Sequence, residues 1–127
     1  MPGQVESMMI LIAGPYRSGT GDDPNKIQTN VKAMEAYAVP LLRAGHLPVL
    51  GEWIALPLLE LAGSKYIGDA VFDEIFHPIA GRLVARCDAV LRIGGESAGA
   101  DLMVKTAEAN GRKVYRSLEE VPGYQAS

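Results

Sequence analysis

Short apolar runs alternate along this chain with longer segments in which apolar residues recur every three or four positions. Runs of this length are typical of buried parallel strands, whereas a spacing of three and four is typical of helices with one apolar face. The predicted strands are residues 8–13, 46–50, 89–93 and 113–115. The predicted helices are one from Pro24 to just before Gly45, with a bend near Pro40, then 52–62, 69–86 and 98–110, and a short helical turn after Ser117.

Prolines and helix-capping residues mark several boundaries of these elements. Asp23 before Pro24 is typical of a helix start, with aspartate as the N-cap and proline at the first helical position. Ser97 is the predicted N-cap of the helix that follows the third strand. Pro48 favours an edge position for the second strand, because proline cannot donate a hydrogen bond inside a sheet.

The alternation of strand and helix indicates right-handed crossovers and a parallel sheet covered by helices on both faces. We therefore predict one α/β domain over residues 1–127, a flavodoxin-like three-layer sandwich whose small parallel sheet has the strand order 2-1-3-4. Residues 1–7 are expected to form a loose leader. In such sheets, ligands bind beyond the carboxyl ends of the strands. The loops at that edge are 14–22, 51–54 and 94–99.

Composition narrows the class of protein. Twelve basic residues face fifteen acidic ones and neither half of the chain is basic, which disfavours binding to nucleic acid polymers or to a membrane surface. The apolar runs fall short of the ~20 residues that span a bilayer. Cys87 is the single cysteine and the two histidines are far apart, so we expect no disulfide, no metal site and no cofactor. These features favour a soluble, cytoplasmic protein.

Two glycine-rich loops at the predicted ligand edge carry candidate binding residues. In the loop 14–19, glycines let backbone approach a ligand, Arg17 offers a forked cation suited to phosphate, and Ser18 adds a hydroxyl group. Ser97 and Gly99 begin a helix whose free N–H groups attract anions. The alternatives are a flexible surface turn for the first loop and a plain capped helix for the second. Because both loops lie at one edge, together they favour a phosphorylated small molecule.

Three segments of the chain carry a family resemblance. They are Ile12-Ala13-Gly14-Pro15-Tyr16-Arg17, Gly45-His46-Leu47-Pro48-Val49, and Cys87-Asp88-Ala89-Val90-Leu91 followed by Glu96-Ser97-Ala98-Gly99-Ala100. They resemble the first strand, second strand, and third strand with its following helix start in the nucleoside 2-deoxyribosyltransferase-like superfamily. Members similar to this chain include the deoxynucleoside 5′-monophosphate N-glycosidases.

The resemblance implies cleavage of the N-glycosidic bond of a (deoxy)nucleoside or its 5′-monophosphate, by hydrolysis or by transfer of the sugar to another base. It places Tyr16 near the sugar, and Arg17, Ser97 and Gly99 at the phosphate. The expected substrate- and phosphate-binding residues are Gly14, Tyr16, Arg17, Ser18, Gly19, Ser97 and Gly99. It also implies a homodimer or larger homo-oligomer in which a neighbour completes the pocket.

The chain departs from the family pattern at the nucleophile. The glutamate expected six residues after Ser97 is replaced by Met103, which cannot attack an anomeric carbon. A second acid, expected about eight residues before Asp88, is replaced by Ala80. The catalytic carboxylate, if there is one, must therefore come from elsewhere in the chain.

Three acids are candidates for that carboxylate: Asp101, Glu52 and Glu96. Asp101 is the nearest acid on the helix, but it points roughly 200° away from Met103. Its alternative role is an ordinary ion pair with Lys105. Glu52 and Glu96 lie at the predicted ligand edge, with exposure to solvent as their alternative.

Other side chains with possible chemistry have simpler expected roles. His77 is expected to pack or cap beside Pro78, and Cys87 is expected to be inert. Trp53 is expected either to stack on a base or to join the core. The predicted helices 52–62 and 69–86 carry more apolar side chains than one small sheet can cover, and this surplus predicts a homo-oligomer. Its members are Leu56, Leu58, Leu59, Leu61, Val71, Phe72, Ile75 and Phe76.

Three functions of different classes remain open. The first is an N-glycosidase or deoxyribosyltransferase-like enzyme that acts on a small-molecule nucleoside or nucleotide. The second is a nucleotide-binding module that kept the pocket and lost the nucleophile, which the presence of Met103 favours. The third is an interaction protein without a ligand, which the two glycine-rich loops disfavour.

Overall fold

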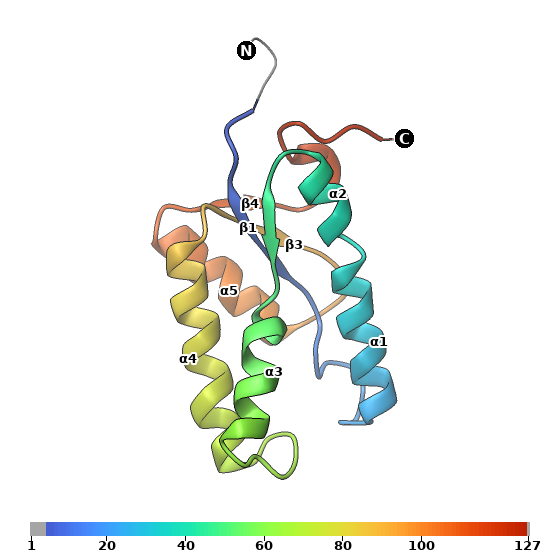
Figure 1. The fold of residues 1–127 in the computed structure, drawn as a ribbon, viewed down its shortest axis with the longest axis vertical. Helices are drawn as coiled ribbons and strands as arrows, with labels where there is room; N and C mark the ends of the chain where they lie inside the picture. Colours follow the sequence, from blue (N-terminus) through green and yellow to red (C-terminus); the bar gives the residue numbers. More distant parts are fainter. Residues whose placement is uncertain (1–4, 127) are drawn as a thin grey trace.

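The computed structural model describes residues 5–126, and its elements follow the predicted order (Figure 1). The strands are β1 (Met9–Ala13), β2 (Leu47–Val49), β3 (Ala89–Arg92) and β4 (Lys113–Tyr115). The helices are α1 (Pro24–Glu35), α2 (Ala38–Arg43), α3 (Gly51–Leu61), α4 (Ala70–Arg86) and α5 (Ala98–Ala109), followed by the short 3-10 helix η1 (Leu118–Glu120). Each expected strand and helix is present, except that the first predicted helix is divided in two.

All four strands are parallel and lie in the order β2-β1-β3-β4, which confirms the predicted sheet. The helices α1 and α2 cover one face, and α4 and α5 cover the other, as in a flavodoxin-like sandwich (Figure 1). Helix α3 packs mainly against α4. Strand β2 is at the edge, as its proline predicted. The carboxyl ends of the strands therefore gather the loop after β1 and the starts of α3 and α5 at one edge.

Alternate residues of the strands point to opposite faces and fill two apolar layers. Ile10 and Ile12 of β1 pack with Met34 on the side of α1 and α2. Leu11 and Ala13 pack on the side of α4 and α5. Because both faces are covered, β1 reads as a continuous apolar run in the sequence.

The division between α1 and α2 has a local cause. The predicted helix extended to just before Gly45 with a bend near Pro40, whereas α1 ends at Glu35 and α2 begins at Ala38. Pro40 lacks the N–H that would bond to the carbonyl of Ala36, and its ring collides with that carbonyl in a regular helix. The chain therefore breaks one turn before the proline.

Side chains cap three of the helices. The Asp23 carboxylate accepts a hydrogen bond from the backbone N–H two residues further on (2.9 Å), and the Ser97 hydroxyl accepts one from Ala100 (3.1 Å). Both caps were predicted. Asp69, expected as the first residue of a helix, is instead the N-cap of α4 and accepts from the backbone N–H of Phe72 (2.7 Å).

The amino-terminal edge of the sheet joins distant parts of the chain. The buried His46 accepts a hydrogen bond at Nδ1 from the backbone N–H of Met8 (3.1 Å), and its Nε2 donates to the carbonyl of Pro122 (2.7 Å). These contacts require the proton on Nε2. The expected leader covers residues 1–7, of which 1–4 lie outside the described residues, and residues 5–7 form no helix or strand.

A helix can cross a lipid bilayer only if it is long and apolar enough. Between residues 5 and 126, none of the helices combines the length and the apolar character needed to cross a bilayer.

Candidate functional site

A cavity of about 200 Å³ lies at the carboxyl edge of the sheet, between the loop after β1, the first turns of α3 and α5, and α4. The lining residues proposed from the sequence are Gly14, Tyr16, Arg17, Ser18, Glu52, Ser97 and Gly99. The others come from α4 and α5 and are Phe72, Phe76, His77, Ala100 and Met103. The fold thus brings the predicted loops together at the point where chain connections leave β1 and β3 in opposite directions.

Glu52 supplies a buried carboxyl group to this cavity. It lies in the first turn of α3, directly after β2, and is only 4% exposed. The alternative of solvent exposure is therefore wrong. Burial raises the pKa of this carboxyl above its ordinary value. Among the described residues, the hydrogen-bond donor at its carboxylate is its own backbone N–H, so the group has no partner from another side chain.

Tyr16 lies beside Glu52 and forms part of an aromatic wall. Its ring centroid is 5.1 Å from that of Phe76 and 6.5 Å from that of Phe72. Burial, and then the neighbouring Glu52 carboxylate, raise the pKa of the Tyr16 phenol. The Asn30 side chain donates a hydrogen bond to the Tyr16 carbonyl (2.9 Å), which fixes the loop. Tyr16 therefore presents a protonated hydroxyl group on an apolar support.

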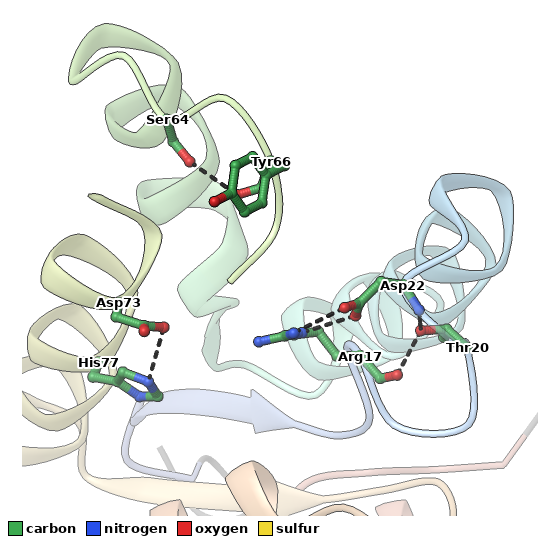
Figure 2. Close-up of polar contacts among 7 residues, drawn as sticks. All are labelled: Arg17, Thr20, Asp22, Ser64, Tyr66, Asp73 and His77. Carbon is green, nitrogen blue, oxygen red and sulfur yellow. Dashed lines mark hydrogen bonds and ion pairs between the residues drawn. The ribbon is translucent and has the colours of Figure 1, made fainter. Parts of the chain in front are cut away.

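Arg17 reaches the cavity with its guanidinium already paired (Figure 2). Its Nε and Nη2 each donate to one carboxylate oxygen of Asp22, both at 2.9 Å. The guanidinium also lies 5.5 Å from the ring centroid of Phe72. It packs so closely on the turn between α3 and α4 that a Cβ added to Gly68 would lie 2.9 Å from Nη2. A phosphate bound by Arg17 would have to compete with Asp22.

The start of α5 forms the opposite side of the cavity. Ser97 is buried there, and its hydroxyl oxygen is used as the helix cap while its O–H remains available to donate. No atom lies within 4 Å of a Cβ built on Gly99, so this position leaves space at the helix end. Arg92, at the end of β3, donates to the backbone carbonyls of Ile93 (2.6 Å) and Gly95 (2.8 Å) and so holds the preceding loop.

Three proposed residues do not line the cavity. The Asp101 carboxylate accepts a hydrogen bond from Nε of Arg92 (3.1 Å) instead of pairing with Lys105, so the expected ion pair is wrong. Asp101 thus points away from Met103, as the helix geometry predicted. Glu96 and Gly19 are exposed outside the cavity.

The aromatic and histidine side chains of α4 were missed as site residues. Phe72 and Phe76 were interpreted as part of an apolar surplus, although their spacing of four residues is typical of one helix face. His77 was expected to pack or cap, but its side chain is 71% exposed and lines the cavity. That interpretation is therefore wrong. Nothing in a single sequence tells which loop such a helix face meets.

A groove of about 180 Å³ continues the cavity between α4 and α5. The two spaces share Phe76, His77, Gly99 and Met103. The groove is otherwise lined by Ala80, Gly81, Val84, Leu102 and Thr106, so it is mainly apolar.

A larger cavity, of about 540 Å³, lies at the opposite edge of the sheet. Its Asp88 carboxylate accepts from the backbone N–H of Met9 (2.8 Å), and its Arg112 guanidinium donates to the carbonyl of Ala85 (2.7 Å). These charged groups hold neighbouring backbone in place. Size alone therefore does not make this cavity the better candidate.

Compared with models of known protein families and with curated protein sequences, the chain matches none. The resemblance to the nucleoside 2-deoxyribosyltransferase-like superfamily therefore depends on the three motifs alone. What the chain does must be argued from the cavity and the residues around it.

Proposed function

We propose that this protein is an enzyme that cleaves or transfers at the N-glycosidic bond of a (deoxy)nucleoside or its 5′-monophosphate. One observation carries the proposal: a buried carboxyl group, Glu52, opens into the same cavity as Arg17 and the start of α5. Burying a carboxyl group without a partner from another side chain costs free energy, so a group held in this way is a candidate for function. A raised pKa suits a carboxyl group that protonates a leaving base.

The polarity of the site supports a nucleotide as the ligand. Arg17, Ser18 and the α5 N-terminus offer donors to a phosphate, while Tyr16 and Phe76 offer apolar surface to a sugar or a base. The cavity of about 200 Å³ is smaller than the roughly 300–1,000 Å³ of common ligand pockets. A nucleotide would therefore also occupy part of the adjoining groove.

The proposal is tested by incubating the protein with each nucleoside 5′-monophosphate, and with the matching nucleosides, and measuring released base by chromatography. We expect release from at least one substrate. Glu52→Gln should lower kcat by roughly 10²–10⁴-fold, because it removes a proton donor while preserving shape. Glu60→Gln, an exposed change on the same helix, is the matched control and should retain activity. Release of base by Glu52→Gln at the wild-type rate would contradict the role of Glu52.

Arg17→Ala tests the phosphate site separately. Loss of a charge-assisted hydrogen bond costs about 1.5–3 kcal/mol, so the Kd of a nucleoside 5′-monophosphate should rise roughly ten- to a hundredfold. The affinity for the matching nucleoside should change little. Calorimetric titration measures both, and equal affinity of the variant and the wild type for the monophosphate would remove Arg17 from the site.

Met103 favours a second candidate function, a nucleotide-binding module without catalysis. Its side chain lines the cavity at the position where the resemblance expects the nucleophilic glutamate. Such a module would bind nucleotides, and so gain thermal stability from them, but would release no base. Met103→Glu should then introduce activity, because the rest of the cavity is in place.

A further inference from the structure

The side chains that can exchange protons in this cavity are few. Among the described residues that line it, they are Tyr16, Glu52 and His77, because Arg17 stays charged and Met103 has no ionisable group. Glu52 is buried, whereas the His77 side chain is 71% exposed. The cavity therefore has one proton-exchanging group in its interior and another at its mouth.

His77 has a neighbour that can orient it. Its Nε2 lies 3.8 Å from a carboxylate oxygen of Asp73, one helical turn earlier on α4. Figure 2 shows this pair on α4, across from Arg17 and Asp22 on the loop after β1. The ring of Phe76 meets the His77 ring edge-on, with centroids 6.5 Å apart. The Asp73 carboxylate thus limits how the imidazole can turn, and water reaches the exposed ring of His77 directly from the solvent.

We propose that His77 is the general base of this site, and that it activates a water molecule which attacks the anomeric carbon of the substrate while Glu52 protonates the departing base. This inference depends on the proposed function. The C–O bond to water forms as the C–N bond breaks. His77 takes the proton of the water, the electron pair of the broken bond goes to the base nitrogen, and Glu52 gives that nitrogen its proton. The protons then return through solvent.

The proposal makes Asp73 a positioning residue. It touches His77 and is absent from the cavity lining, so it would act through the imidazole. Its neighbour Glu74 is exposed on the same helix and lines neither the cavity nor the adjoining groove. Asp73→Asn and Glu74→Gln therefore form a matched pair of variants.

Attack by water in a single displacement has consequences that covalent catalysis does not share. Retaining glycosidases pass through a glycosyl–enzyme intermediate, whereas inverting ones use a base to direct water onto the opposite face of the sugar. Because Met103 stands in place of a carboxylate, we expect the inverting mechanism, in which a base directs water onto the sugar. The protein should hydrolyse its substrate, and a free base should not exchange into unreacted nucleotide.

The first experiment is base exchange. Wild-type protein is incubated with the nucleotide that it cleaves and with the same base carrying an isotopic label. We expect release of unlabelled base and no label in the remaining nucleotide. Label in the nucleotide would reveal a covalent sugar intermediate and overturn the proposal.

The second experiment is chemical rescue. His77→Ala should lower kcat by roughly 10²–10⁴-fold and leave the Kd of the nucleotide within about twofold of wild type, because the histidine acts on water. Added imidazole should restore part of the activity, since the site is open to solvent. Asp73→Asn should lower kcat less than His77→Ala, and Glu74→Gln should behave as wild type.

The outcomes separate this proposal from the one on which it depends. Base release by wild type, together with undiminished release by His77→Ala, overturns the role of His77 and leaves the proposed function standing. A loss in His77→Ala without rescue by imidazole, and with weakened nucleotide binding, identifies His77 as structural and also overturns the proposal. Absence of base release from every substrate by wild type overturns both.

Discussion

Arg17, the proposed phosphate-binding residue, is paired with an acidic side chain that would compete with a phosphate. Its two hydrogen bonds to Asp22 keep the guanidinium beside the ring of Phe72. Both side chains are about two-fifths exposed, so water screens their attraction. Replacing Asp22 by a phosphate as the partner of Arg17 therefore costs little free energy. Asp22 also has a positive φ of 60°, a conformation that aspartate and asparagine tolerate better than most residues.

Asp22→Asn should therefore strengthen phosphate binding. Asparagine keeps the backbone conformation but removes the charge that competes with the ligand. Water weakens exposed ion pairs, so the affinity for a nucleoside 5′-monophosphate should rise only modestly, by up to roughly fivefold. Calorimetric titration measures the change. Weaker binding by Asp22→Asn would mean that Asp22 positions Arg17 and does not compete with the phosphate.

Gly14 and Gly81 differ in what a methyl group would meet. A Cβ at Gly14 would lie 2.8 Å from Cδ1 of Ile93 and 3.1 Å from its carbonyl oxygen, so Gly14→Ala should destabilise the fold by about 1–3 kcal/mol. A Cβ at Gly81, inside α4, would have no atom within 4 Å. Gly81→Ala should therefore raise the free energy of unfolding by about 0.5–1 kcal/mol. Denaturant unfolding of both variants tests whether the free energy of unfolding falls in Gly14→Ala and rises in Gly81→Ala. A stable Gly14→Ala would show that β1 can move away from Ile93.

Residue-level reasoning identified most of the cavity before the structure was known. Gly14, Arg17 and Ser97 could be found because each follows a strand at a known edge. The burial of Glu52 and the exposure of His77 could not, because both depend on how α3 and α4 pack against each other. That packing has no signature in the local sequence.

The turn between α3 and α4 depends on one side chain, Asp69. Its carboxylate accepts hydrogen bonds from the backbone N–H groups of Lys65 (2.8 Å) and Phe72 (2.7 Å), and from the hydroxyl of Ser64 (2.9 Å). These donors lower the pKa of Asp69 to about 2. The same turn packs against the guanidinium of Arg17 through Gly68, so its order affects the cavity.

This turn should loosen in acid. Since the pKa of Asp69 is lower in the folded chain than its ordinary value of 3.8, its contribution to stability is complete above that value. The contribution is lost as the pH falls through about 2. Hydrogen exchange at the amides of Lys65 and Phe72 should accelerate over this range. In Asp69→Asn the acceleration should disappear, whereas Glu74→Gln should keep it, and an unchanged profile in Asp69→Asn would assign the transition to other groups.

The presence and order of the helices and strands were easier to predict from the sequence than the residues at which they begin and end. The order of strands and helices followed from apolar spacing, because it is set by burial on one face or two. A bend near Pro40 was predicted, but a full break was not, because the apolar spacing continues across it to Leu41, which is buried. The spacing of apolar residues indicates which face of a helix is buried, but it does not indicate whether the helix continues without a break.

At the scale of the molecule, α3 leaves apolar side chains uncovered. Ile54, Leu58 and Leu61 recur on one side of the helix and are 40%, 41% and 82% exposed. The sequence interpretation placed Leu59 and Phe72 in the same surplus, but both are buried. A smaller patch than expected therefore remains to support a homo-oligomer.

We still expect self-association through this patch, because grouped apolar side chains on a surface commonly mark an interface. Analytical ultracentrifugation at micromolar concentration should detect a dimer or a larger assembly. Leu58→Glu should dissociate it by placing a charge in the contact, and Glu60→Gln should not. A monomeric wild type would contradict the expectation, and an assembly that survives Leu58→Glu would place the interface elsewhere.

The hydrogen bonds of His46 to Met8 and Pro122 hold both ends of the described chain at the amino-terminal edge of the sheet. The cavity lies at the carboxyl edge, and Figure 1 shows the first and last of residues 5–126 at one end of the molecule and the turn between α3 and α4 at the other. A tether attached at either terminus would therefore fix the protein to a sensor chip with its cavity facing the flowing solution. Surface-immobilised protein can thus report small-molecule affinities without obstruction by its own anchor.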